Sequence, residues 1–219
     1  MREFDRRAKA RQDVVFFARY VDDIVVVFSP TLSSNRQVYK GRVVDQLKEL
    51  NLTVNSNKVN ESPDDRKNWN LTYLGYEFRY DSSTSCKTLL SAQKMKRYET
   101  RLEACFIRYH RQRAKDAKKA YRLLVKRIQY LTLNTQLTHN KSNAFVGIFF
   151  SSPHLTDLRQ LRLLDGKLIG HITRLAHSPS LQAKLRQYSF VAGYEERIFR
   201  RFHRPGQFEE ITKAWDYGR

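Results

Sequence analysis

The feature that most constrains the fold is a short polar break between two apolar runs near the start of the chain. Residues 14–19 and 24–28 are rich in β-branched and aromatic side chains, and Tyr20-Val21-Asp22-Asp23 lies between them. Two such runs on either side of a short break predict a tight β-hairpin. The chain is therefore expected to turn at a pair of adjacent aspartates.

Two adjacent carboxylates are an unusual choice for such a turn. Ionised side chains at Asp22 and Asp23 repel each other, whereas a turn selected only for stability favours Asn-Gly or Asp-Gly. A cation relieves this repulsion, and Mg²⁺ prefers oxygen ligands of this kind. Two metal ions about 3.5–4 Å apart are a common device for in-line attack on phosphate. An ordinary turn with solvated aspartates is the competing interpretation.

The charge of the chain predicts a polyanionic partner. The 219 residues include 41 Lys and Arg against 22 Asp and Glu, a formal net charge of +19, and 41% are hydrophobic, which is sufficient for a packed core. Most of the excess lies after residue 90, where 26 basic residues accompany 10 acidic ones. Nucleic acid is the expected partner, and a charged solvent face on a helical bundle is the plainer alternative.

Other compositional signals narrow the class of protein. The sequence has two cysteines, Cys86 and Cys105, no hydrophobic signal core, and no run near the roughly 18 apolar residues of a membrane span. We therefore expect a cytoplasmic protein with free thiols and no membrane partner. The histidines lack zinc-ligand spacing, and the glycines form neither a phosphate-binding loop nor a hydrolase elbow.

The pattern along the chain predicts an α+β domain over residues 1–90. After the end of a helix or a linker at 1–12 and the hairpin, a helix runs from Ser33 or Ser34 to about Leu50. Short strands are predicted at 51–55, 71–80 and 87–90. Gly75 marks either a bulge in its strand or a close approach by another backbone.

Residues 91–219 are predicted to be all-helical and basic. Apolar positions recur at helical spacing over residues 95–109 and 121–131, with basic residues on the other faces. A third helix is expected from about Leu155 to Leu175, followed by shorter helical pieces after Pro179. The domain boundary is therefore expected near Ser91.

Three segments, in order, resemble the C-terminal half of a reverse transcriptase. Residues 17–23 are similar to the family's catalytic Tyr-x-Asp-Asp hairpin, residues 50–58 resemble the following motif, and residues 73–78 resemble the primer grip. This resemblance implies part of a polymerase palm subdomain over residues 1–90 and a thumb over residues 91–219. Within the family, residues 19–23 and 143–158 look most like bacterial enzymes of the antiphage-defence groups.

The resemblance also implies a chemistry: an RNA-directed DNA polymerase that uses Mg²⁺, deoxynucleotide triphosphates, an RNA template and a DNA primer. Asp22 and Asp23 would be the catalytic metal ligands, and Lys58 would approach the triphosphate, unless it is merely a solvated turn lysine. The residues expected to contact nucleic acid are Tyr20, Gly75, Tyr76, Lys94, Arg97, Arg101 and Arg108.

One departure from the family leaves the site incomplete. Reverse transcriptases place their first metal-binding aspartate and their fingers before the hairpin, whereas only nineteen residues precede Tyr20 here, and Glu3, Asp5 and Asp13 do not lie in an apolar strand. We expect an upstream palm-and-fingers half or a partner chain to supply the missing carboxylate, with a structured non-coding RNA as a further candidate partner. The alternatives are a non-catalytic nucleic-acid-binding module with a vestigial hairpin, and a gene fragment that folds poorly because it exposes a sheet edge.

Overall fold

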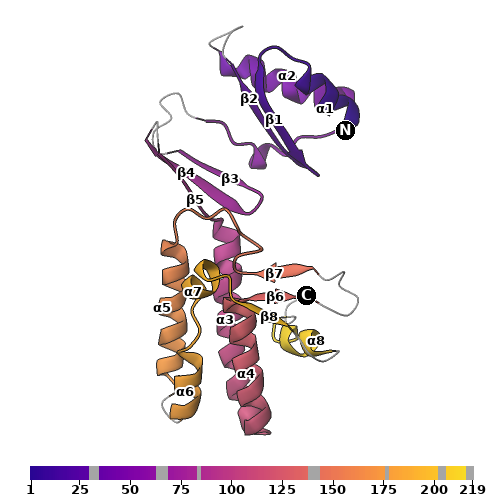
Figure 1. Ribbon diagram of the computed structural model, residues 1–219. Helices are drawn as coiled ribbons and strands as arrows, with labels where there is room; N and C mark the ends of the chain where they lie inside the picture. Colours follow the sequence, from indigo (N-terminus) through magenta and orange to yellow (C-terminus); the bar gives the residue numbers. More distant parts are fainter. Residues whose placement is uncertain are drawn as a thin grey trace. The chain divides into compact units, whose positions relative to one another are not determined.

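The computed structural model describes residues 1–29, 35–62, 69–82, 85–137, 144–175, 178–201 and 206–215. Contacts within the chain define two units, Met1–Asp65 and Arg66–Arg219, whose elements are labelled in Figure 1. The boundary lies before the strands of residues 69–90, rather than near Ser91 as the change in composition predicts. The α+β class is confirmed, since both units combine helices with small sheets.

The first unit is built on the predicted hairpin, which is confirmed. Strand β1 (Val14–Tyr20) pairs antiparallel with β2 (Asp23–Phe28), and Tyr20 lies opposite Asp23. Helices α1 (Arg2–Lys9) and α2 (Arg36–Glu49) belong to the same unit (Figure 1). The α2 helix begins after Asn35, whose side chain accepts a hydrogen bond from the Gln37 amide at 3.0 Å. Ser33 and Ser34, the predicted caps, lie outside the described residues.

One face of the hairpin packs against helices, and the other face is exposed. On one face, Phe17 packs against Phe4 of α1 with ring centroids 5.9 Å apart, and Phe28 packs against Tyr39 of α2 at 5.0 Å. Side chains alternate across a strand, so Tyr20, Phe16 and their partners point to the other face. This second face exposes large apolar side chains, namely Phe16, Tyr20 and Val27.

The strand predicted over residues 51–55 is wrong. Asn51 adopts a left-handed φ of 57°, residues 52–55 have no regular structure, and a short 3-10 helix, η1, follows at Ser56–Lys58. Asn55 caps this helix by accepting a hydrogen bond from the Asn57 amide at 3.1 Å. The alternation of this segment favours a strand, but its asparagines take turn and cap positions instead.

The second unit begins with a three-stranded antiparallel sheet. Its order is β3 (Trp69–Tyr73), β4 (Tyr76–Ser82) and β5 (Ser85–Leu90), so the predicted pairing of residues 87–90 is confirmed. The single strand predicted at 71–80 is wrong, because a two-residue turn at Leu74-Gly75 divides it. Both turn residues have positive φ, 48° and 77°, which is the pattern of a type I′ turn.

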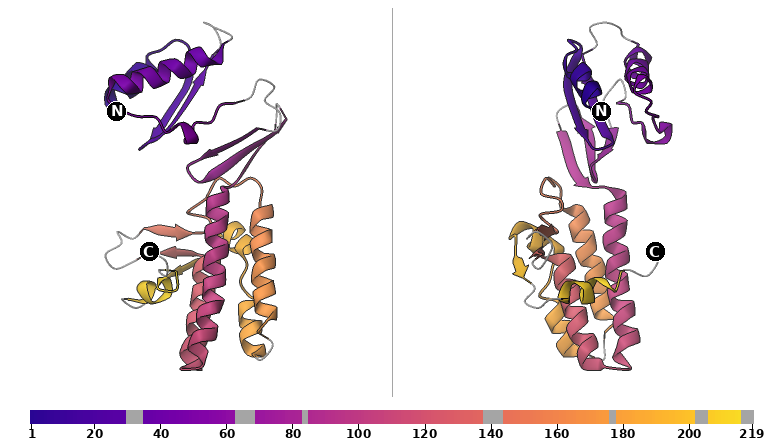
Figure 2. Two further views of the ribbon diagram at one scale, coloured as in Figure 1. Left: turned by 180° about the vertical axis from the view of Figure 1, so that it is seen from behind. Right: turned by 90° about the vertical axis from the view of Figure 1, so that its right-hand side faces the viewer.

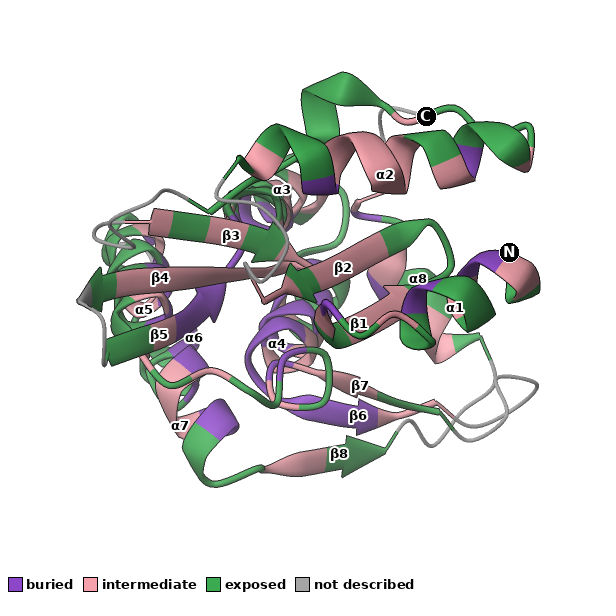
Figure 3. Cartoon of the chain, turned by 90° about the horizontal axis from the view of Figure 1, so that it is seen from above, coloured by how far each residue is buried: buried purple, intermediate pink, exposed green. Residues whose placement is uncertain are grey.

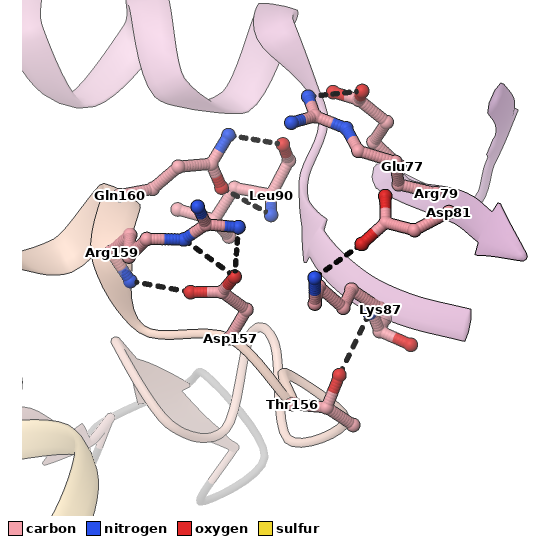
Figure 4. A network of polar contacts seen from close by, with 10 residues as sticks. Glu77, Arg79, Asp81, Lys87, Leu90, Thr156, Asp157, Arg159 and Gln160 are labelled. Atoms are coloured by element: carbon pink, nitrogen blue, oxygen red, sulfur yellow. Dashed lines mark hydrogen bonds and ion pairs between the residues drawn. The ribbon is translucent and has the colours of Figure 1, made fainter. Parts of the chain in front are cut away.

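Hydrogen bonds attach this sheet to the helical part of the same unit (Figure 4). The Gln160 side chain both accepts from the Leu90 amide at 2.7 Å and donates to the Leu90 carbonyl at 3.0 Å. The Thr88 amide donates to the hydroxyl of Thr156 at 2.8 Å. Leu90 also joins the main hydrophobic core. These contacts explain why residues 69–90 belong with the helices rather than with the first hairpin.

The three predicted helices are confirmed as α3 (Ala92–Arg113), α4 (Ala117–Thr132) and α5 (Arg159–Thr173). They run alongside one another in the views of Figures 1 and 2 and bury a common apolar core. Shorter helices follow at α6 (Pro179–Leu185), α7 (Phe190–Glu195) and α8 (Gln207–Thr212). Among the described residues, no helix has the length and apolarity needed to cross a membrane.

The prediction that residues 91–219 are all-helical is wrong. A second small sheet, seen in Figure 3, has the order β7 (Phe145–Gly147), β6 (Asn134–Gln136) and β8 (Phe199–Arg201). Strand β8 pairs parallel with β6 although the two are distant in sequence. The buried side chain of Asn134 donates to the carbonyls of Gly193 and Ile198 at 3.0 and 3.2 Å, which fixes this long-range pairing.

Candidate functional site

The two aspartates lie at the tip of the first hairpin. Val21 and Asp22 form the two-residue turn between Tyr20 and Asp23, and all four residues are exposed. Within the described part of the chain, neither Asp22 nor Asp23 accepts a hydrogen bond or forms an ion pair. Two carboxylates therefore lie side by side at an accessible turn, where the charge of the Arg19 guanidinium interacts with Asp22 without forming a hydrogen bond to it.

The turn backbone is strained. Val21 has a φ of 55°, a region that β-branched residues rarely occupy. The residue is 65% exposed, so packing does not hold it in this conformation. Only the first central residue has positive φ, an arrangement in which glycine is the usual choice. A left-handed backbone costs a non-glycine residue about 1–2 kcal/mol. Local propensity therefore does not account for this turn.

Arg19 holds the strained turn in place. Its Nη1 atom donates to the Val21 carbonyl at 2.8 Å, while its Nε and Nη2 atoms each donate to the Asp5 carboxylate at 2.7 Å. The Arg19 guanidinium holds the pKa of Asp5 below its usual value, despite an opposing effect of burial. Asp5 thus connects α1 to the turn through Arg19.

The other acidic residues before the hairpin are also committed to arginines. Asp13 is buried and accepts from Arg11 at 2.8 and 2.6 Å, and this contact lowers the pKa of the Asp13 carboxyl. Glu3 accepts from Arg6 and Arg7 at 2.8 and 2.9 Å. Among the described residues, no group of three or more His, Cys, Asp or Glu side chains is placed to hold a metal ion.

Two further predicted site residues lie in the first unit. Tyr20 is exposed and faces Asp23 across the hairpin. Lys58 is exposed at the end of η1. The contacts of the structure do not join Lys58 to the aspartates, so its role at a triphosphate stays a prediction.

Three predicted residues of the second unit come together around the Leu74-Gly75 turn. The Lys94 ammonium lies 4.9 Å from the centre of the Tyr76 ring and donates to the Ser151 carbonyl and Ser152 hydroxyl at 2.8 and 3.1 Å. A Cβ atom on Gly75 would come within 2.5 Å of the Lys94 Cε atom. The ammonium is therefore bound inside the unit, and burial lowers its pKa. A phosphate contact by Lys94 stays a prediction.

The remaining predicted arginines line an open groove along α3, with a volume of about 650 Å³. Trp215 closes one side: its indole donates to the Arg101 carbonyl at 3.0 Å, and the Arg101 guanidinium lies 5.3 Å from its ring centre. The lining contains basic residues and no acidic residue. Its basic members are Lys96, Arg97, Arg101, Arg108 and Arg111.

Sequence reasoning missed Arg19, Lys96, Arg111 and Trp215 as site residues. Arg19 is part of the hairpin motif, but only the structure shows that it contacts the Val21 carbonyl. Lys96 and Arg111 follow from helical spacing, because positions 93, 96, 100, 104, 107 and 111 form one stripe along a helix. Nothing in the local sequence predicts that Trp215 returns to α3.

Comparisons with protein-family models, with curated proteins and with solved structures found no match to this chain. The candidate sites are therefore defined by their own chemistry. The hairpin presents two exposed carboxylates on a braced, strained turn. The α3 groove presents five cations beside an aromatic ring, which is a surface that suits a nucleic-acid backbone.

Proposed function

We propose that the chain supplies the catalytic hairpin and the thumb of an RNA-directed DNA polymerase. The observation that carries this proposal is the turn at Val21: strain is retained there, an arginine braces it, and two carboxylates that accept no described hydrogen bond project from it. Backbone strain concentrates at functional sites, where the surrounding structure maintains it. The three motifs that resemble a reverse transcriptase, and their order, imply that the reaction is DNA synthesis on an RNA template.

The donor set of the hairpin fits Mg²⁺. This ion is usually held by one or two carboxylates together with waters and substrate phosphates, and Asp22 and Asp23 supply the two carboxylates. When bound, Mg²⁺ would activate the primer hydroxyl and stabilise charge on the departing pyrophosphate. The carboxylates of Glu3, Asp5 and Asp13 are occupied by arginines, so the third carboxylate is proposed to come from a partner.

The open face of the hairpin supports the need for a partner. Phe16 and Val27 are exposed on the same face as Asp23, and the two-stranded sheet leaves both outer edges unpaired by any described strand. A further strand of a palm sheet would cover apolar surface and bring a carboxylate next to the turn. The groove on α3 would hold the duplex of template and primer through phosphate contacts, which carry little sequence preference.

Primer extension tests this proposal. The chain is mixed with the palm-and-fingers half of a reverse transcriptase, an RNA template, a DNA primer, deoxynucleotides and Mg²⁺. We expect extension that requires both halves and that falls at least about a hundredfold in the variant Asp22→Asn/Asp23→Asn. The matched control is Asp45→Asn, which removes an exposed carboxylate of α2 in the same unit. Extension that survives loss of both hairpin carboxylates would refute the catalytic role.

A second function is favoured by the charge of the groove. Five basic residues and Trp215 suffice for a non-catalytic nucleic-acid-binding module, in which the aspartates are vestigial. The two functions differ in one measurement. If no added half restores synthesis, while binding weakens steeply with salt and Arg101→Gln/Arg108→Gln reduces it, the binding module is the better account.

A further inference from the structure

A cluster of phenylalanines, none of which lines the α3 groove, lies on the small β7-β6-β8 sheet. Phe145 and Phe150 are 50% and 41% exposed, and their ring centroids lie 5.2 Å apart. Phe199 of β8 lies 5.3 Å from Phe145 and 6.4 Å from Phe150. We call these three residues the aromatic platform. A group of large aromatic rings at a surface indicates an interaction site, whereas single exposed apolar residues do not.

The platform is held rigidly from below. The Oδ1 atom of buried Asn134 accepts from the amides of Phe149 and Phe150 at 2.9 and 3.4 Å, which fixes the turn after β7. At Gly147, with φ 136°, an added Cβ atom would meet the Asn134 backbone at 2.5 Å. Strand and turn therefore pack too closely for the rings to be repositioned freely. A preorganised surface binds a flexible ligand at lower entropic cost.

Cations flank the platform at both ends. The sheet register places Arg201 opposite Gln136, which in turn lies opposite Phe145, so Arg201 is on the face of β8 that also carries Phe199. At the other end, the Arg197 guanidinium lies 4.5 Å from the ring centre of Phe149, which contacts Phe150. The strands and the turn after β7 contain no acidic residue, although Glu195 and Glu196 precede Arg197. Exposed rings between arginines match a ligand with flat apolar faces and negative charges.

We propose that the aromatic platform binds single-stranded nucleic acid by stacking unpaired bases on Phe145 and Phe150, with Arg201 and Arg197 near the backbone. Unpaired bases offer their faces to aromatic rings, whereas a duplex keeps them stacked inside. Small sheets with exposed aromatic residues and nearby cations suit this ligand. The platform would bind single strands whether or not the first hairpin is catalytic.

Fluorescence anisotropy with labelled twelve-residue oligouridine, oligothymidine and an RNA duplex tests the platform on the full chain. We expect Phe145→Leu/Phe150→Leu to weaken single-strand binding at least about tenfold, because it keeps apolar bulk and removes the stacking faces. Duplex binding should change less than about twofold. Weaker binding of oligouridine alone would support an RNA-specific platform. Weaker binding of both oligouridine and oligothymidine would support a platform for single strands in general.

The matched control replaces two exposed apolar residues of α5, Leu163→Ala/Ile169→Ala, and should leave both affinities unchanged. Phe145→Trp/Phe150→Trp should retain single-strand binding, since the rings are kept. Circular dichroism establishes that each variant is folded, and Phe145→Leu alone replaces the double variant if that one unfolds. The proposal would be overturned if Phe145→Leu/Phe150→Leu weakened the binding of single strands and duplex equally. It would also be overturned if single-strand binding were unchanged while sedimentation showed altered self-association of the chain.

Discussion

The two hairpin turns solve the same backbone problem in different ways. Each places a bulky apolar residue at positive φ in its first central position, Val21 at 55° and Leu74 at 48°. The second turn follows with Gly75, which tolerates φ 77°, and is backed by the packed side chain of Lys94. The first turn follows with Asp22, is braced by a hydrogen bond from Arg19 to the Val21 carbonyl, and leaves its side chains exposed.

The Leu74-Gly75 turn is therefore packed against its own unit, whereas the Val21-Asp22 turn is exposed. Lys94 contacts Tyr76 and the Ser151-Ser152 segment, so the second turn is tied into the core of its unit. The first turn is supported only through its backbone, which leaves two carboxylates accessible. We infer that the second turn has a structural role, whereas the first turn exposes the carboxylates of Asp22 and Asp23. Four changes test this contrast.

The largest effect is expected at Gly75. Gly75→Ala places a Cβ atom at positive φ and moves the flexible end of the Lys94 side chain away from its hydrogen bonds, so we expect a loss of about 1–2 kcal/mol in the free energy of unfolding. Chemical denaturation measures it. In a Lys94→Ala background the same change should cost about half as much. The matched control, Gly170→Ala in α5, meets no atom within 4 Å and should be neutral or stabilising.

A smaller effect of opposite sign is expected at the first residue of each turn. Val21→Gly and Leu74→Gly relieve the positive φ but increase the freedom of the unfolded chain, so each should stabilise by about 0.5–1 kcal/mol. Thermal unfolding measures both. In the complemented primer-extension assay, only Val21→Gly should lower the rate, because it relaxes the turn that holds the carboxylates. Equal effects of the two variants on synthesis would break the contrast.

The braces should also respond differently to pH. The Asp5 carboxyl, whose pKa Arg19 lowers, contributes stability that is present above about pH 4 and is lost as pH falls through the folded-state pKa. Burial lowers the pKa of Lys94, so stability should rise as pH increases from its folded-state pKa toward its unfolded value. Melting temperatures across pH should show a flatter acid limb in Asp5→Asn and a flatter alkaline limb in Lys94→Met.

The smallest effect on stability is expected from the residues proposed to matter most for activity. Asp22→Asn/Asp23→Asn removes two carboxylates that accept no described hydrogen bond, and it removes both their mutual repulsion and the weaker attraction between Asp22 and Arg19. The free energy of unfolding should change by less than about 0.5 kcal/mol or rise slightly. Urea denaturation measures it, with Asp13→Asn as the contrasting variant, since Asp13 is buried against Arg11 and should destabilise clearly.

The sequence predicts elements that local patterns specify. The alternating apolar runs predict β1 and β2, and helical spacing predicts α3, α4 and α5. It fails where a residue acts against its propensity or through a distant contact. Leu74 at positive φ conceals the second turn, and the pairing of β6 with β8 depends on buried Asn134. The aspartate pair was predictable; its brace by Arg19 and Asp5 was not.

We propose that Asp22 and Asp23 form an exposed metal-binding pair. Nuclear magnetic resonance of the ¹⁵N-labelled chain with traces of Mn²⁺ tests it directly, since a paramagnetic ion broadens the amides nearest its site even when binding is weak. We predict selective broadening at residues 21–24 that Mg²⁺ competes away and that Asp22→Asn/Asp23→Asn abolishes, while Asp45→Asn has no effect. Broadening that is absent at this turn, or unchanged in the double variant, would contradict the account.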